Sequence, residues 1–482
     1  MKRKNLSLRS LSISIAVAIC TVASAQYNNS SYFMEGMSYR HQLNPAFAAE
    51  RAYINAPLFV LGNLNVGMQG NIGVDDFIYP YDGNGYDLTT FMNSAVDADK
   101  FLDRLHDRNL LNVSASMPVI SMGFNAFGGF NSIEIGAKVN ASANLPYELF
   151  EFAKLGMSDA ALTEYNIRDL NIRTNAYTEI ALGHSHRLAN DRLAIGAKLK
   201  MLIGLANIDA NVRSMKLTMG QERWAIEADG TADISLNKAT FTYDEDSKID
   251  GIDVDKFGTC GFGTAVDLGF EYDFRDVVPG LKVSAALLDL GFIKWKKGIA
   301  ANLKSSYTFD GFEEQIVIDA DNDDLGKLEN QIDKIEDDLK DLFTFEEDKN
   351  CKARTTTLAT TLNAGVEYAL PTYRNLKFGL LSSTRINGVH TWSEARLSAN
   401  IAPVKWFEAS VNYAYSTFGS SFGWVINFHP RGFNFFVGTN HTMGKITPQG
   451  IPVGDANAHV NVGMNITWGG KSKKDKQEQP VL

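Results

Sequence analysis

Few residues in this sequence have the types and spacing that catalysis or metal binding requires. The most compact group is His184, Ser185 and His186. Neighbouring residues of a strand point to opposite faces, so Ser185 does not share a site with the histidines. His184 and His186 share a face, but two ligands alone make a weak metal site. We therefore predict that they lie at a strand end near the membrane interface and bind no metal.

An acidic stretch, residues 319–324, has oxygen-bearing side chains at alternate positions, as in half of a calcium-binding loop. Asp324 stands where such a loop needs glycine, and Asn330 stands where it needs a bidentate glutamate. We interpret the stretch as a solvated acidic loop. The sequence has no Gly-x-Ser-x-Gly, His-Glu-x-x-His, Walker or Cys-x-x-Cys motif. We therefore predict no enzymatic activity and no cofactor.

Charged residues instead follow a two-residue period. In residues 131–143 one face is apolar, while Glu134 and Lys138 lie on the other. Alternation over about 10 residues is typical of strands that cross a membrane with one face towards lipid and one towards the lumen. The charged residues that we predict to face the lumen are Glu134, Lys138, Arg173, Lys198, Lys200, Asp267, Glu271, Glu367, Lys377, Arg385, Glu394 and Arg396.

The same alternation recurs along the chain and predicts a transmembrane antiparallel β-barrel of about 14 strands. The segments are 57–72, 109–127, 131–143, 167–187, 191–205, 258–274, 280–293, 353–370, 374–386, 389–401, 405–416, 419–429, 431–440 and 458–468. An even count puts both chain ends on one side. Two further runs within 206–236 either extend a hairpin above the membrane, which we favour, or raise the count to 16. Aromatic residues on the apolar faces favour lipid contact over a soluble β-sandwich.

The N-terminus predicts export. Four basic residues precede an apolar run from Leu11 to Val22 and the small residues Ala23-Ser24-Ala25, which is the layout of a secretory signal peptide. Its removal changes the formal charge from −10 to −14, since it deletes four positive charges. That balance disfavours nucleic acid as a partner. Together with the barrel pattern, the signal peptide predicts that the protein lies in the bacterial outer membrane.

Loop lengths divide the chain, because short turns face the periplasm and long loops face outwards in such barrels. We expect short helices in the outer loops, and an amphipathic helix at 325–342 that packs across the barrel mouth or docks to another chain. The predicted divisions are a signal peptide at 1–25, an N-terminal periplasmic or hatch segment at 26–56, the barrel at 57–468 with large extracellular loops at 206–257 and 294–352, and a periplasmic tail at 469–482.

Two cysteines, Cys260 and Cys351, remain after the signal peptide. Both fall at the outer ends of predicted strands. In an exported protein they either form a disulfide or are two independent small residues at strand ends.

The segment Leu43-Asn44-Pro45-Ala46-Phe47-Ala48 resembles the Asn-Pro-Ala segment of long-chain fatty-acid transporter-like barrels. Together with residues 288–295 and 266–269, it resembles an uncharacterised Bacteroidota outer-membrane barrel family, a domain of unknown function. The first resemblance implies 14 strands and an N-terminal hatch that includes Asn44, Pro45 and Ala46. Such a hatch would occupy the lumen and gate it.

Two functions fit these expectations. The first is a channel or transporter for small or hydrophobic, even amphipathic, solutes, with outer-membrane lipid as its surroundings. The alternative is a non-transporting scaffold or surface-assembly component that binds partners through its large loops.

Overall fold

The computed structural model describes residues 28–55, 62–81, 87–156, 163–220, 224–244, 247–256, 258–304, 306–309, 344–442 and 457–469. The predicted signal peptide, the acidic stretch at 319–324, the helix at 325–342 and residues 470–482 lie outside these ranges. None of the helices in the described ranges has the length and apolar character needed to cross a membrane.

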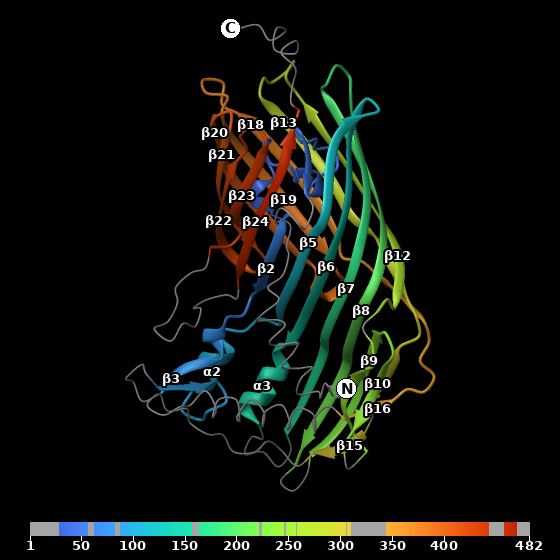
Figure 1. The fold of residues 1–482 in the computed structure, drawn as a ribbon. Coiled ribbons are helices and arrows are strands. Elements are labelled where there is room, and N and C mark those ends of the chain that lie inside the picture. The colour runs from blue at the N-terminus through green and yellow to red at the C-terminus, as the bar shows by residue number, and fades with distance from the viewer. Residues whose placement is uncertain are drawn as a thin grey trace.

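The described strands form a closed antiparallel barrel of 14 strands (Figure 1). Closure comes from the last strand, which pairs with both pieces of the first. In chain order the strands are β1 (Ala52–Asn55) with β2 (Leu64–Gly70), β5 (Arg108–Ala126), β6 (Gly129–Pro146), β7 (Thr163–Leu188), β8 (Leu193–Met219), β12 (Gly261–Asp273), β13 (Leu281–Trp295), β17 (Arg354–Thr357) with β18 (Thr360–Ala369), β19 (Leu376–Ile386), β20 (Trp392–Val404), β21 (Phe407–Ser416), β22 (Gly419–Phe428), β23 (Phe433–Thr439) and β24 (Ala458–Trp468). The predicted count is confirmed.

Side chains alternate between the two faces of the wall, as the sequence period predicts. Leu199 is 63% exposed on the outer face, whereas the adjacent Lys198 is 2% exposed on the inner face. Leu397 and Arg396 repeat the contrast at 60% and 1%. A belt of exposed apolar side chains around a closed barrel is stable in lipid and is the architecture of outer-membrane proteins.

The two ends of the barrel differ. At one end, which we call the short-turn end, consecutive strands join through tight turns. Phe127 and Gly128 between β5 and β6 both have positive φ, the conformation that a two-residue hairpin requires. The opposite end, the long-loop end, carries the long connections (Figure 1). There α2 (Ala98–Leu102) and α3 (Tyr147–Leu155) pack with β3 (Ile78–Tyr81) around a cluster that includes Phe101 and Phe150. The β3 strand pairs with β4 (Asp87–Thr90).

The β7 and β8 strands continue beyond the barrel at the long-loop end. The β9 strand (Trp224–Leu236) pairs with the far half of β8, and β14 (Ile299–Leu303) and β15 (Ser306–Phe309) pair with β9. The β16 strand (Phe345–Glu347) adds to β14, and β10 (Ala239–Tyr243) and β11 (Ile249–Val254) form a separate hairpin. Residues 206–236 therefore extend a hairpin, and the alternative of 16 barrel strands is wrong.

Residues 28–50 lie inside the barrel, near the short-turn end (Figure 1), and we call them the plug. The plug contains two short 3₁₀ helices, η1 (Asn29–Ser31) and η2 (Arg40–Gln42). The first strand then begins at Ala52, five residues earlier than the predicted boundary at 57. The reason is that Ala52 to Ile54 already pair with the end of β24.

Candidate functional site

The centre of the plug fits a slot in the barrel wall made by two glycines. Gly196 of β8 and Gly269 of β12 are register partners. A Cβ atom at Gly196 would lie 2.1 Å from the carbonyl oxygen of Pro45, and one at Gly269 would lie 2.0 Å from Asn44 Oδ1. Any larger residue would collide with the plug, so glycine at both positions allows the close approach.

Asn44 fastens this segment to the wall. Its Nδ2 group donates to the carbonyl oxygens of Phe270 on β12 and Ala285 on β13, at 3.1 and 3.2 Å. Its Oδ1 accepts from the backbone N–H of Ala46 at 2.9 Å, which closes a local turn. A side-chain amide is the only polar group of this size that both donates and accepts in this way.

Beside this slot, a buried network joins the plug to β6 and β8 of the wall. Glu134 of β6 accepts hydrogen bonds from Gln42 of the plug, at 2.7 Å, and from Lys198 of β8, at 2.9 Å. Lys198 Nζ also lies 3.2 Å from Nδ1 of His41. The other ring nitrogen of His41 lies 2.6 Å from the hydroxyl of Tyr53. Two charged side chains of the wall are therefore satisfied partly by the plug.

At the short-turn end the plug carries a carboxylate of its own. Glu35 forms ion pairs with Lys282 of β13 and Lys377 of β19, at 2.6 and 3.0 Å. The backbone N–H of Gly36 donates to both carboxylate oxygens of Glu408 on β21. Charge complementarity thus holds the turn of the plug against three strands.

The beginning of the plug meets a second ion pair. Arg396 and Glu394 of β20 pair at 2.7 Å, and both are almost completely buried. Asn29 donates to Glu394 at 3.2 Å, and the hydroxyl of Ser30 accepts from Arg396 at 3.2 Å. The plug therefore completes the hydrogen bonding of this pair as well.

A third group of charges lies on the wall. Lys200 of β8 pairs with Asp267 at 2.7 Å and with Asp289 at 2.6 Å. Lys138 joins this group through an ion pair in which its Nζ lies 2.9 Å from a carboxylate oxygen of Glu179. Simple alternation did not predict Asp289, because a register shift between β12 and β13 and its positive φ turn it inwards. The repeated Asp-Leu-Gly at 267–269 and 289–291 was the available signal.

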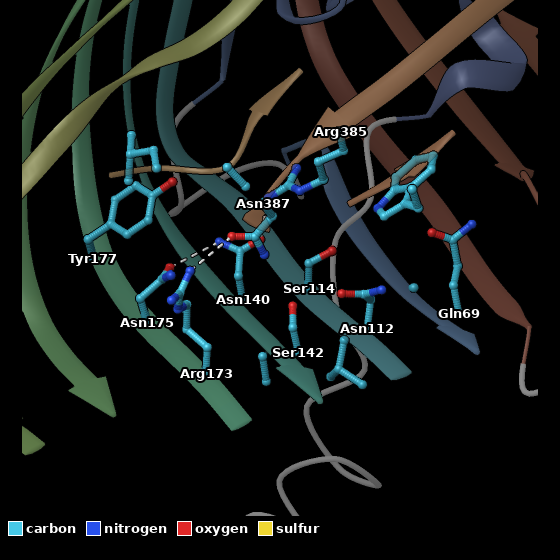
Figure 2. Close-up of a pocket in the computed structure, with 16 residues that line it drawn as sticks. Gln69, Asn112, Ser114, Asn140, Ser142, Arg173, Asn175, Tyr177, Arg385 and Asn387 are labelled. Carbon is cyan, nitrogen blue, oxygen red and sulfur yellow. Dashed lines mark hydrogen bonds between the residues drawn. The ribbon is translucent and has the colours of Figure 1, made fainter. Parts of the chain in front are cut away.

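A vestibule opens beside these layers, on the side of the long-loop end (Figure 2). The empty space between its side chains, including the part open to solvent, is about 610 Å³. Arg173 of β7 and Arg385 of β19 both reach amide groups there, as Figure 2 shows: Arg173 bonds Asn387 at 3.5 Å, and Arg385 bonds Asn140 at 2.9 Å. The lining residues are Gly67, Gln69, Asn112, Val113, Ser114, Asn140, Ala141, Ser142, Arg173, Asn175, Tyr177, Leu358, Ala359, Arg385, Asn387 and Trp392.

His390 lies in the loop between β19 and β20, three residues after Asn387 of the vestibule lining. Its Nε2 is 2.5 Å from Asn171 Oδ1. Burial, and to a smaller degree the charge of Arg173, lower the pKa of His390 to about 4, against the partial opposition of Asp209. The imidazole is therefore neutral at physiological pH.

The structure places all twelve charged residues that were predicted to face the lumen on the inner side of the wall. It brings them into separate groups instead of one line of charge. Glu134 and Lys198 meet the plug, Glu394 pairs with Arg396, and Lys377 pairs with Glu367 at 3.4 Å. Glu271 is half-buried on the inner face of β12. No pattern in the sequence indicates that Glu35, His41 and Gln42 of the plug are partners of these charges, since the contacts join segments far apart in the chain.

Cys260 and Cys351 are both free in this structure. The Cys260 thiol is buried among Tyr177, Leu202 and Trp295, and its Sγ donates to the carbonyl of Ser235 at 3.2 Å. Cys351 lies on the loop before β17, and its Sγ is 3.8 Å from the carbonyl oxygen of the neighbouring Lys352.

The two histidines singled out by spacing lie near the short-turn end. The rings of His184 and His186 are 6.0 Å apart, and His184 Nδ1 bonds Asn131 at 3.0 Å. Within the part of the chain that the structure describes, no three His, Cys, Asp or Glu side chains are grouped as a metal site requires.

Comparison with known proteins gives one family and several distant folds. A model of a family of unknown function, DUF5723, matches residues 45–440. No curated protein matches the chain. Among solved structures, the Pseudomonas putida toluene transporter TodX has 9% identity and a TM-score of 0.34, covering 92% of this chain and 94% of that one. The translocator domain of the autotransporter NalP from Neisseria meningitidis has 9% identity and a TM-score of 0.33, covering 93% and 99%. Likeness at this level assigns no activity.

Proposed function

The chain belongs to DUF5723, a family of unknown function, and from its barrel we propose that it is a plug-gated outer-membrane channel for small solutes. Solute enters the vestibule at the long-loop end, which faces the outside. It leaves at the short-turn end, which faces the periplasm, when the plug is displaced. The proposal includes export by the N-terminal signal peptide.

One observation carries this proposal: the wall behind the plug is polar. Asn461 and Asn465 of β24, Asn412 of β21 and the Glu134–Lys198 pair all face the plug and are buried by it. A permanently filled lumen needs no such lining, because apolar side chains pack there without a desolvation cost. When the plug leaves, polar and charged groups are hydrated instead of exposing an apolar surface. The wall therefore suits a lumen that fills with water.

The apolar side chains of the plug form two clusters. Tyr32, Phe33, Leu43 and Phe47 pack on one another, with Leu381 as the wall residue of their cluster. Contacts within this cluster would move with the plug. The second cluster packs Met34, Met37 and Tyr39 against wall residues that include Phe130, Val425 and Phe436, and it is the apolar contact that displacement of the plug would break.

The test is solute flux into liposomes that contain the purified barrel. We expect little flux with the native chain and a marked rise after deletion of residues 28–50. Because the deletion removes packing from the lumen, Gly269→Ala provides a second route to an unseated plug. Equal flux in the native chain and both variants, with each barrel folded, contradicts the proposal.

A second function has support from the β7–β8 hairpin. These strands have 26 and 27 residues, whereas about 9 to 11 cross a membrane. With β9 and β14 they form a sheet beyond the membrane, which suits a scaffold that holds a partner. If the protein is a scaffold, truncation of this sheet abolishes binding of its partner and leaves solute flux unchanged.

A further inference from the structure

The vestibule differs in charge from the rest of the molecule. The chain carries a formal charge of −10, yet the described residues that line the vestibule include two arginines and no aspartate or glutamate. Its other polar members are amides and hydroxyls, so no lining side chain offsets the arginines. A concave surface with one sign of charge raises the local concentration of ligands of the opposite sign.

The two arginines are not equivalent. Arg173 Nε lies 3.1 Å from Asp209, which neutralises much of its charge. Arg385 is half-buried and donates to the neutral amide of Asn140. Among the residues that the structure describes, Arg385 has no carboxylate within ion-pair distance. A guanidinium that is partly removed from water without a counter-charge favours binding of an anion.

A second unmatched group on the lining is also a donor. The Nδ2 atom of Asn112 on β5 is buried and has no hydrogen-bond partner within the described part of the chain. Leaving a buried N–H unpaired is costly, so a ligand that offers an oxygen acceptor would gain from it. An anion with an oxygen acceptor would therefore satisfy both the Arg385 guanidinium and the side-chain N–H of Asn112.

We propose that the vestibule binds a small polar organic anion through its carboxylate, with Arg385 as the main recognition residue. The planar guanidinium matches a carboxylate with two parallel hydrogen bonds, and the amides of Asn140 and Asn112 receive the polar remainder. This inference names the substrate class of the proposed channel and to that extent rests on the proposed function.

The test measures binding of succinate to the purified, folded chain in a non-ionic detergent by calorimetry. Succinamide, a neutral analogue of similar shape, and 1,4-diaminobutane, a cation, are the comparison probes. We expect succinate to bind, the other two not to bind, and the affinity for succinate to fall with added salt, because screening weakens the attraction.

Arg385→Gln should weaken succinate binding by about tenfold to a hundredfold, the usual effect of losing a charge-assisted hydrogen bond. Arg385→Lys keeps the charge but loses the two-pronged geometry, so its affinity should fall between those of the native chain and Arg385→Gln. Arg192→Gln, in the turn between β7 and β8 at the other end, is the matched control and should leave binding unchanged. Retention of the heat-dependent gel mobility of the barrel establishes folding for each variant.

Equal binding of succinate and succinamide, or native affinity in folded Arg385→Gln, overturns the inference. The assay requires no transport, so its failure is separate from that of the proposed function. If succinate binds but no solute flux is seen, the channel proposal is wrong and the anion site stands. If flux is seen but succinate does not bind, the anion site is wrong and the channel proposal stands.

Discussion

Gly196 of β8 and Gly269 of β12 are register partners on neighbouring strands of the barrel wall, and the plug occupies the space that their missing side chains leave. Asn44 and Pro45 fill this slot, which explains why an Asn-Pro-Ala segment and a glycine on each of two neighbouring strands occur together. The slot fixes the plug through shape, whereas the ion pairs around it fix the plug through charge.

Gly269→Ala should partly unseat the plug. The new methyl group would overlap Asn44 Oδ1, and relieving such overpacking costs about 1–3 kcal/mol. That cost falls on the seated state, so we expect a rise in liposome flux of about tenfold or more. Ala197→Val is the matched control, because it adds bulk one residue from Gly196 on the exposed outer face. Native flux in a folded Gly269→Ala barrel would show that the slot does not hold the gate.

Glu134→Gln should destabilise the protein strongly. It leaves the buried Lys198 ammonium without a carboxylate, a situation that typically costs about 3–5 kcal/mol. Glu134→Gln combined with Lys198→Met should cost less than Glu134→Gln alone, because no unpaired charge remains. The measurement is the denaturant midpoint of each variant. Arg213→Gln, which breaks an exposed ion pair with Asp229, is the control and should leave the midpoint unchanged.

The two cysteines should differ in reactivity without forming a bond. Cys260 is 3% exposed, and burial raises the pKa of its thiol to about 11, so it stays protonated and shielded. Cys351 lies on a loop and is only partly buried. For the chain without residues 1–25, which contain Cys20, we expect one maleimide per folded molecule and two after denaturation, read by mass. A preparation that takes up label only after reduction would instead show a disulfide.

His390 should make the long-loop end sensitive to acid. Its pKa is about 4 in the folded protein and near 6.5 when unfolded, so the unfolded state binds the proton more readily. Stability is therefore full above about pH 6.5 and falls as the pH drops towards 4, by up to about 3 kcal/mol. His390→Gln should flatten the change in melting temperature between pH 7 and pH 4.5. His106→Gln, at an exposed position of the same end, should preserve the native slope.

The strands could be predicted because their information is local. Each wall residue faces either lipid or the lumen, so a two-residue period in a segment such as 458–468 identifies both its conformation and its inner face. The same reasoning placed Lys198 and Arg396 inwards. The inward position of Asp289 could not be predicted in this way, because one extra residue in the ladder reverses the alternation.

The sequence alone thus determined the barrel, its 14 strands and the inward side of its charges, since these follow from periodicity within each strand. Only the tertiary structure decided which charges meet. Glu134 binds Gln42 and Lys198, and Arg385 is left without a carboxylate among the described residues, because closure of the barrel and entry of the plug bring together residues far apart in the chain. No local pattern records such contacts, and the slot, the gate and the anion site all depend on them.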